Sequence, residues 1–235
     1  MVEPFTITID GREVQALPGQ TLLEACRKND IFIPTLCHFD GLSEMGACRL
    51  CLVEVEGINK LLPTCVTKVN PNQKIHTQTE KLQTYRKMIV ELLFSERNHI
   101  CAVCVANNNC ELQDLAKSVG MEHVRFPYLQ PKADIDLSHD RYVIDHNRCV
   151  MCTRCVRVCD EVEGAHVWDV MGRGSDSRIV AGFHDPWGTS SACTWCGKCS
   201  MVCPVGAIWP KESSQGKLLR FPNLVSELVE KRNDL

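Results

Sequence analysis

The first 78 residues alternate apolar and polar positions in a way that predicts a small sheet with one helix. Phe5 to Ile9 alternates as a strand does, Asp10-Gly11 favours a tight hairpin turn, and Arg12 to Ala16 returns as a second strand. Thr21, with Glu24 three residues later, has the capping-box pattern of a helix start. The inner side of this helix would consist of Leu22, Leu23 and Cys26. Two more strands are expected at residues 52–55 and 61–66. Together these elements predict a β-grasp domain over residues 1–78.

Residues 79–130 follow a helical period instead. A capping box at Thr77 and Glu80 precedes apolar residues at helical spacing, which predicts a helix with one side packed into the core. That side would consist of Leu82, Tyr85, Met88, Ile89, Leu92 and Leu93. A second helix is expected from Glu111 to a stop near Gly120. The pattern predicts a small helical module.

The last part of the chain, residues 131–235, combines short strands with polar loops. Residues 131–138 have the composition of an exposed linker, and residues 142–144 predict a strand. The remaining elements expected here are an inserted hairpin, at residues 167–170 and 178–180, and a last helix around residues 224–231. The fold class predicted for the whole chain is therefore α+β.

Composition narrows the class of protein. The chain has 235 residues, 16 cysteines and a formal net charge of −3, which argues against a strongly basic nucleic-acid binder. The N-terminus lacks the pattern of a signal peptide, and the apolar runs are much shorter than a membrane span. We therefore expect a cytoplasmic protein with no membrane insertion. In that compartment the cysteines are expected to bind metal rather than form disulfides.

Two near-copies of one cysteine pattern lie between Cys149 and Cys203. Each reads C-x2-C-x2-C-x3-C, and the second ends in Pro204, as bacterial ferredoxin runs do. In such runs the fourth cysteine binds the other cluster, so we expect two [4Fe-4S] clusters with crossed ligands. Cluster A would take Cys149, Cys152, Cys155 and Cys203, and cluster B would take Cys193, Cys196, Cys199 and Cys159. The alternative is zinc, which prefers paired C-x2-C knuckles and has little use for this duplication.

Three arginines, Arg148, Arg154 and Arg157, stand beside the cluster A cysteines in the sequence. They are candidates for raising the potential of that cluster or for binding an acidic partner. A solvated basic face is the default expectation for such residues.

The N-terminal module has a cysteine group of its own. It is spaced C-x10-C-x2-C-x13-C and consists of Cys37, Cys48, Cys51 and Cys65. Plant-type ferredoxins use C-x4-C-x2-C with a distant fourth cysteine, so the first gap is longer here. Gly46 and Ala47 are small enough to let backbone amides approach sulfur. We expect a [2Fe-2S] cluster, with zinc as the alternative.

Two further residues of this module are not expected to bind metal. Cys26 is expected to be a core residue, and His38 is expected to face solvent or to form local hydrogen bonds.

The middle module has only three cysteines, spaced C-x2-C-x5-C: Cys101, Cys104 and Cys110. A third [4Fe-4S] cluster would need a fourth ligand, and His99 is the only imidazole close by in the sequence. Water or a side chain distant in sequence is the alternative. A neutral imidazole makes a cluster less negative than a thiolate does, and in Rieske centres this replacement raises the potential.

No motif in the chain points to a substrate. No G-x-G-x-x-G follows a strand, and no pair of nucleophile and base stands out, so we expect no catalytic residues and no cofactor-binding residues beyond the cluster ligands. The chemistry expected is one-electron transfer through one [2Fe-2S] and three [4Fe-4S] clusters, about fourteen iron atoms per chain.

In this order of modules the whole chain resembles the HoxU-type iron–sulfur subunit of the diaphorase module of NAD-reducing [NiFe] hydrogenases. It is also similar to the N-terminal parts of the large iron–sulfur subunit of complex I, of iron-only hydrogenases and of NAD-dependent formate dehydrogenases. Those longer chains continue into a further large domain, whereas this sequence stops at Leu235. One departure is that His99 stands only two residues before Cys101, closer than in the complex I pattern.

The resemblance implies partners and a reaction. It implies a flavoprotein NADH-binding subunit that holds FMN and NAD, and hydrogenase small and large subunits that hold the NiFe centre. This chain would relay electrons between them as a subunit of an oxidoreductase that interconverts H2 and NAD+. Alternatives within the same chemistry are a formate dehydrogenase, a bifurcating enzyme or a complex I-like NADH dehydrogenase. A zinc-stapled interaction protein is the alternative from a different class.

Overall fold

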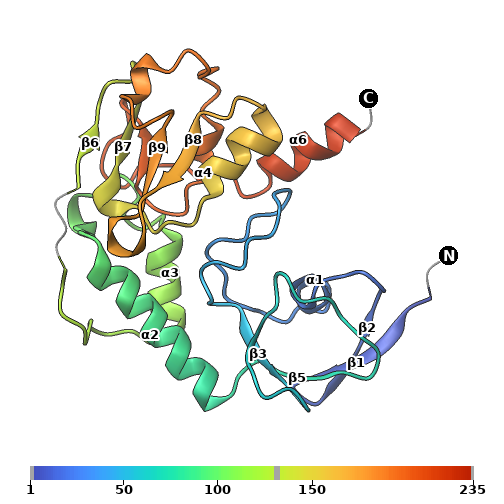
Figure 1. Ribbon diagram of the computed structural model, residues 1–235. Coiled ribbons are helices and arrows are strands. Elements are labelled where there is room, and N and C mark those ends of the chain that lie inside the picture. The colour runs from blue at the N-terminus through green and yellow to red at the C-terminus, as the bar shows by residue number, and fades with distance from the viewer. Residues whose placement is uncertain (1–2, 130–132, 234–235) are drawn as a thin grey trace. The chain divides into compact units, whose positions relative to one another are not determined.

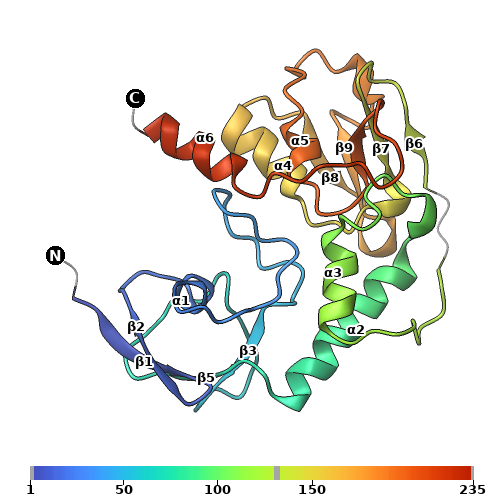
Figure 2. The same cartoon turned by 180° about the vertical axis from the view of Figure 1, so that it is seen from behind.

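The computed structural model describes residues 3–129 and 133–233, and Figures 1 and 2 show it from opposite sides. The chain divides into two compact units. The first unit comprises Met1–His38 and Glu44–Ile89, and the second comprises Phe39–Ser43 and Val90–Leu235. Residues 79–89 fall in the first unit and the rest of the middle module falls with the last module, so the module boundaries at residues 78 and 130 stay predictions.

The first unit is a five-stranded sheet of order β2-β1-β5-β3-β4, with one helix. Its elements are β1 (Phe5–Ile9), β2 (Arg12–Ala16), α1 (Leu22–Lys28), β3 (Leu52–Val55), β4 (Leu62–Pro63) and β5 (Lys74–His76). β1 runs parallel to β5, and all other neighbours are antiparallel. This arrangement is the predicted β-grasp (Figure 1). The strand expected at 61–66 covers only Leu62–Pro63, because the chain then turns and Thr67 N donates back to Pro63 O at 3.1 Å.

Local signals in the sequence account for the start of this unit. Asp10 and Gly11 both adopt positive φ, 50° and 81°, as a two-residue turn between twisted strands requires. The predicted capping box is present: Glu24 N donates to Thr21 Oγ1 at 3.1 Å, and the Thr21 N–H donates to the Glu24 carboxylate at 2.5 Å.

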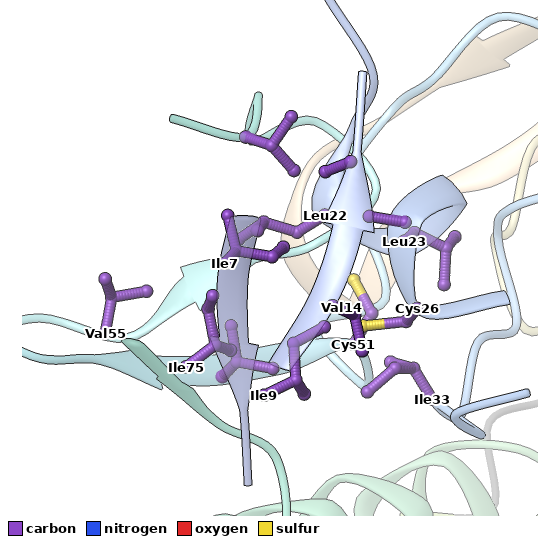
Figure 3. Close-up of a cluster of buried hydrophobic side chains, with 14 of the residues drawn as sticks. Ile7, Ile9, Val14, Leu22, Leu23, Cys26, Ile33, Cys51, Val55 and Ile75 are labelled. Atoms are coloured by element: carbon purple, nitrogen blue, oxygen red, sulfur yellow. The ribbon is translucent and has the colours of Figure 1, made fainter. Parts of the chain in front are cut away.

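The core of the first unit lies between α1 and the sheet (Figure 3). Ile7 and Ile9 from β1 meet Leu22 and Leu23 from α1, and Cys26 is fully buried among them. Burial raises the pKa of the Cys26 thiol to about 12, so this side chain is a neutral core residue.

Helix α2 (Glu80–Glu96) differs from the prediction at its start and along its side. Thr77 does not form the expected capping box, because it is buried and its N–H donates to Asp10 Oδ1 at 2.7 Å. Thr79 Oγ1 accepts from Leu82 N at 3.3 Å instead. The expected apolar side is only partly buried: Leu82 is enclosed, whereas Tyr85 is 39% exposed.

Arg86 is a charged residue of α2 whose burial is explained by its tertiary contacts. It is buried, and its guanidinium donates to three backbone carbonyls, those of Leu50, Thr77 and Leu52, at 3.2, 2.8 and 3.0 Å. These bonds satisfy two carbonyls on either side of Cys51 and one in the segment between β5 and α2, a role that periodicity cannot reveal.

The second unit surrounds two small sheets, of order β10-β7-β6 and β8-β9. Its helices are η1 (Cys101–Val103), α3 (Glu111–Ser118), η2 (His146–Arg148), α4 (Arg154–Arg157), η3 (Val158–Glu163), η4 (Gly174–Asp176), η5 (Trp187–Thr189), α5 (Lys198–Met201) and α6 (Leu224–Asn233). Its strands are β6 (Ile135–Asp136), β7 (Tyr142–Asp145), β8 (Trp168–Met171), β9 (Arg178–Ala181) and β10 (Ile208–Pro210). The expected strand, inserted hairpin, second helix and last helix are confirmed by β7, by β8 with β9, by α3 and by α6.

Part of the expected linker, residues 131–138, is structured. Residues 131 and 132 lie outside the described residues, and Ile135–Asp136 forms β6 at the edge of its sheet. In the part of the chain that is described, no helix has the length and apolarity needed to cross a bilayer.

Candidate iron–sulfur sites

The 16 cysteines carry no disulfide. No three His, Cys, Asp or Glu side chains among residues 3–129 and 133–233 converge closely enough to hold a single metal ion. The candidate ligands instead form four separate groups, one in the first unit and three in the second.

In the first unit the four candidate cysteines form two pairs. Cys48 N donates to Cys37 Sγ at 3.5 Å, and the Sγ atoms of Cys51 and Cys65 are 3.5 Å apart. The hydrogen bond from Cys65 lowers the pKa of Cys51, so Cys51 is the thiol of this pair that gives up its proton first. The side chains of Cys48 and Cys37 are also hydrogen-bonded to each other, so each pair brings two sulfurs together. Two such pairs fit a [2Fe-2S] cluster, in which each iron needs two protein ligands.

The loop that carries these cysteines depends on left-handed backbone. Gly46 and Arg49 have φ of 64° and 58°, on either side of Cys48. The positive φ is what favours glycine at position 46, because an added Cβ would make only an ordinary contact with the Val66 side chain at 3.4 Å.

His38 does not face solvent, one of the two expected situations, but bonds locally. It is buried, with Nε2 2.8 Å from the Arg27 guanidinium and Nδ1 2.7 Å from the Glu44 carboxylate. Both ring nitrogens are therefore occupied by protein groups, which leaves no lone pair for a metal.

The middle group of the second unit lines one small cavity. Its wall includes His99, Cys101, Cys104 and Cys110, the four predicted ligands. Gly206 lies so close to Cys104 that an added Cβ would clash with the sulfur. Burial raises the pKa of Cys110 to about 11, so the free thiol keeps its proton and would release it on binding metal.

The two ring nitrogens of His99 differ in a way that suits a ligand. The ring bonds to the backbone carbonyl of Leu93, whereas Nε2 is buried and has no hydrogen-bond partner among the described residues. Burial lowers the pKa of His99 to about 4, so the ring is neutral at pH 7. A histidine that ligates metal through one nitrogen commonly donates its other N–H to a carbonyl.

The two cysteine runs of the second unit fold alike. Met151 and Thr153 in the first run have φ of 51° and 57°, and their counterparts Trp195 and Gly197 in the second have φ of 61° and 73°. Each run continues into a short helix, α4 or α5. The repeat in the sequence is therefore also a repeat in backbone conformation.

The fourth cysteine of each run lies with the first three of the other run. One cavity is lined by the expected cluster A set, Cys149, Cys152, Cys155 and Cys203. A second is lined by the expected cluster B set, Cys159, Cys193, Cys196 and Cys199. Desolvation raises the pKa of the thiols around the first cavity, that of Cys149 to about 11 and that of Cys152 to about 12.

The arginines beside cluster A do not form the solvated face that was the default expectation. Arg154 and Arg157 are buried. Arg148 is half-buried, and its Nε donates to Asp145 Oδ2 at 2.8 Å. Arg154 donates to both carboxylate oxygens of Glu111 at 2.7 and 2.8 Å, with its guanidinium 5.1 Å from the Phe39 ring centre. Arg157 donates to the Cys152 carbonyl at 3.3 Å. The charges are therefore used inside the unit, next to the cavity.

Three family profiles match the chain in succession. The profile described as "2Fe-2S iron-sulfur cluster binding domain" matches residues 2–80. "NADH-ubiquinone oxidoreductase-G iron-sulfur binding region" matches residues 86–125, and "NADH-quinone oxidoreductase subunit 3, ferredoxin-like domain" matches residues 142–209.

The relatives that are similar to the chain include proteins of about its own length and much longer proteins. An NADH-quinone oxidoreductase subunit of Rhizobium meliloti (strain 1021) is 36% identical over 86% of this chain and 23% of its own length. The gamma subunit of the NAD-reducing hydrogenase HoxS of Cupriavidus necator is 32% identical over 87% of this chain and 86% of its own length. A chain in a crystal structure of an NAD+-reducing [NiFe]-hydrogenase in the H2-reduced state superposes with a TM-score of 0.84, at 34% identity, over 89% of this chain and 88% of that one.

These findings define the chain as an iron–sulfur protein with a [2Fe-2S] ferredoxin domain, a [4Fe-4S] region and a ferredoxin-like domain. More narrowly, it belongs to the family of the gamma, or HoxU-type, iron–sulfur subunit of NAD-reducing hydrogenases. It spans between 23% and 36% of the length of other curated relatives, such as the Rhizobium protein and the NADP-reducing hydrogenase subunit HndD of Solidesulfovibrio fructosivorans.

Proposed function

We propose that this chain is an electron relay with one [2Fe-2S] and three [4Fe-4S] clusters. The observation that carries the proposal is the grouping of the ligands: three cavities of the second unit are each lined by one predicted set. The proposed ligands are Cys37, Cys48, Cys51 and Cys65 for the [2Fe-2S] cluster; His99, Cys101, Cys104 and Cys110 for the middle cluster; and the crossed sets named above for clusters A and B.

The second unit also suggests an order for its three clusters. Val205 lines both the His99 cavity and the cluster A cavity. The helical segment from Cys155 to Cys159 joins cluster A to cluster B, and Cys196 of cluster B is exposed. We therefore propose the order His99 cluster, cluster A, cluster B, with cluster B as the end closest to a partner.

The proposed partners follow from the relatives. One relative is a subunit of an NAD-reducing hydrogenase, and the similar crystal structure is that of an NAD+-reducing [NiFe]-hydrogenase. We propose that this chain, in the cytoplasm, links a flavoprotein NADH-binding subunit to hydrogenase small and large subunits. The whole complex would interconvert H2 and NAD+, with FMN, NAD and the NiFe centre held by the partners.

A second candidate function keeps the relay and changes the enzyme. It is favoured by the 36% identity to the NADH-quinone oxidoreductase subunit from Rhizobium. The chain would then serve a complex I-like dehydrogenase, a formate dehydrogenase or a bifurcating enzyme.

The experiment that separates the two is anaerobic purification of the tagged chain from its host, followed by an assay of H2-dependent NAD+ reduction. Activity, with nickel and flavin in the same complex, is the expected result. An intact complex that oxidises NADH but ignores H2 would move the relay to the second group of enzymes. A colourless chain that contains zinc would overturn the relay itself.

A further inference from the structure

One histidine outside every cysteine motif lies against cluster B. His139 precedes β7, is only 1% exposed, and places its Nε2 atom 3.7 Å from Cys193 Sγ. Nothing in the sequence singles it out, because it stands far from Cys193 along the chain and follows no metal-ligand spacing.

The backbone around His139 fixes its tautomer. The N–H groups of Arg141 and Tyr142 both point at His139 Nδ1, at 3.1 and 3.3 Å. A backbone N–H can only donate, so Nδ1 must be the unprotonated acceptor. In a neutral imidazole the proton then sits on Nε2, the atom that faces the sulfur.

The ring has little freedom to turn away. Its centre lies 4.4 Å from that of Trp187 and 4.7 Å from that of Trp195, so indoles pack on it. The loop before it is tied down as well: Asp136 Oδ2 accepts from Trp187 N at 2.7 Å, and Ser138 Oγ accepts from Gly188 N at 2.8 Å. The donor is therefore held in place before any electron arrives.

We propose that His139 tunes cluster B by donating an Nε2–H hydrogen bond to the Cys193 sulfur. This inference rests on the proposed function, since it requires Cys193 to ligate a cluster. A hydrogen bond to a ligand sulfur stabilises the more negative, reduced cluster and so raises its reduction potential. His139 acts through Cys193 and is a positioning residue rather than a ligand.

Other hydrogen-bond donors reach the sulfurs of the same cavity, and they limit how far the loss of one donor can shift the reduction potential of cluster B. Val167 N donates to Cys159 Sγ at 3.4 Å, and the Trp168 indole bonds to Cys199. The Lys198 ammonium is paired with the Glu163 carboxylate beside the same turn. Removal of His139 takes away one donor among several, so cluster B should persist with an altered potential.

The test compares His139→Phe, which keeps a ring but has no donor, with His139→Gln, which keeps an amide donor. His123→Phe, at an exposed site of the same unit, is the matched control. Each full-length protein is purified anaerobically, its iron is measured, and its reduction is followed by electron paramagnetic resonance during a redox titration.

We expect one four-iron couple of His139→Phe to show a reduced-to-oxidised ratio about tenfold lower at a fixed potential, a downward shift of about 59 mV. His139→Gln should recover part of this shift, and His123→Phe should show none.

A second measurement does not need the variants to fold. In wild-type protein whose histidine rings carry 15N, the signal of a cluster that His99 does not bind should show a coupled histidine N–H whose proton disappears in D2O, which separates His139 from the Val167 and Trp168 donors. Unchanged couples in folded, fully loaded His139→Phe, or the absence of an exchangeable proton in the wild type, would overturn the inference. A wild-type protein that lacks cluster B altogether would instead overturn the proposed function, and the iron content distinguishes that case.

Discussion

At the scale of single residues, His99 shows how burial and one hydrogen bond prepare a side chain for metal. One ring nitrogen is engaged by the Leu93 carbonyl, and the other is buried with no partner among the described residues. The edge of the ring meets Phe94, with ring centres 5.3 Å apart. The lone pair is therefore available at neutral pH, and solvent is kept from it.

Replacement of His99 tests its proposed role directly. His99→Ala should remove the fourth ligand of the middle cluster and lower the iron content from about fourteen to about ten atoms per chain, with loss of one paramagnetic signal on reduction. Iron analysis and electron paramagnetic resonance of the anaerobic protein provide the measurement. His123→Ala, at an exposed site, should keep both. Full iron and an unchanged set of signals in His99→Ala would mean that another group completes the cluster.

The sequence identifies candidate ligands better than it identifies their surroundings. The cysteines could be grouped because ferredoxin spacing follows from the turns that bring thiols together. Arg154 and His139 could not be placed, because their partners, Glu111 and Cys193, are far away in the sequence. No local period reports such contacts.

At the scale of elements, the two cysteine turns of the second unit depend on residues in left-handed conformation. Met151, Thr153 and Trp195 accept that conformation despite their side chains, whereas the fourth position holds Gly197. A Cβ at Gly197 would clash with the hydroxyl of Tyr142, so both its φ of +73° and its close neighbour favour glycine there.

Gly197→Ala should therefore destabilise the cluster B turn by about 1–2 kcal/mol from its conformation alone, and by more because of the clash. Thermal unfolding and iron content of the anaerobic protein measure the effect. Gly174→Ala is the control, since Gly174 has φ of +57° but nothing within 4 Å of an added Cβ. Equal losses for the two variants would show that the Tyr142 contact does not matter.

The start of α1 gives a prediction for the first unit. Thr21→Ala removes the side chain that accepts from Glu24 N, and it should lower the free energy of unfolding of this unit by about 1 kcal/mol. Denaturant unfolding followed by circular dichroism is the measurement. Thr84→Ala, exposed within α2, should not lower the stability, because alanine is the better helix former. If both variants behave alike, the capping box contributes nothing.

Elements with strong local signals were predictable, and elements set by distant contacts were not. The β1–β2 hairpin, α1 and the β8–β9 hairpin carry their own turn residues, cap or alternation. β5 has only three residues and is defined by its pairing with β1 and β3. No local pattern in the sequence predicts that pairing. On α2 the helical period was predicted correctly, but the buried positions include Arg86.

At the scale of the whole molecule, the two units should differ in their need for metal. The core of the first unit is mainly aliphatic and includes two candidate ligands, Cys51 and Cys65, whereas the core of the second unit contains cysteines from both runs and has more of them packed against it. Anaerobic removal of iron by a chelator should therefore abolish slow amide hydrogen exchange in the second unit and leave the β1–β2 hairpin protected. Exchange measured by mass spectrometry before and after removal, and again after reconstitution, tests this. Equal loss in both units would mean that the [2Fe-2S] cluster is needed as much as the others.

The exchange of fourth cysteines between the two runs has a consequence for how the protein is made. Cys203 joins the cavity of the first run, and Cys159 joins that of the second. With these ligands, a nascent chain that has been synthesised only as far as the first run lacks the fourth ligand of cluster A. Cluster insertion must therefore wait until both runs have been synthesised. Oxygen damage to either cluster would likewise disturb a helix that also carries a ligand of its neighbour. Partly matured preparations should therefore consist of molecules with both clusters or with neither.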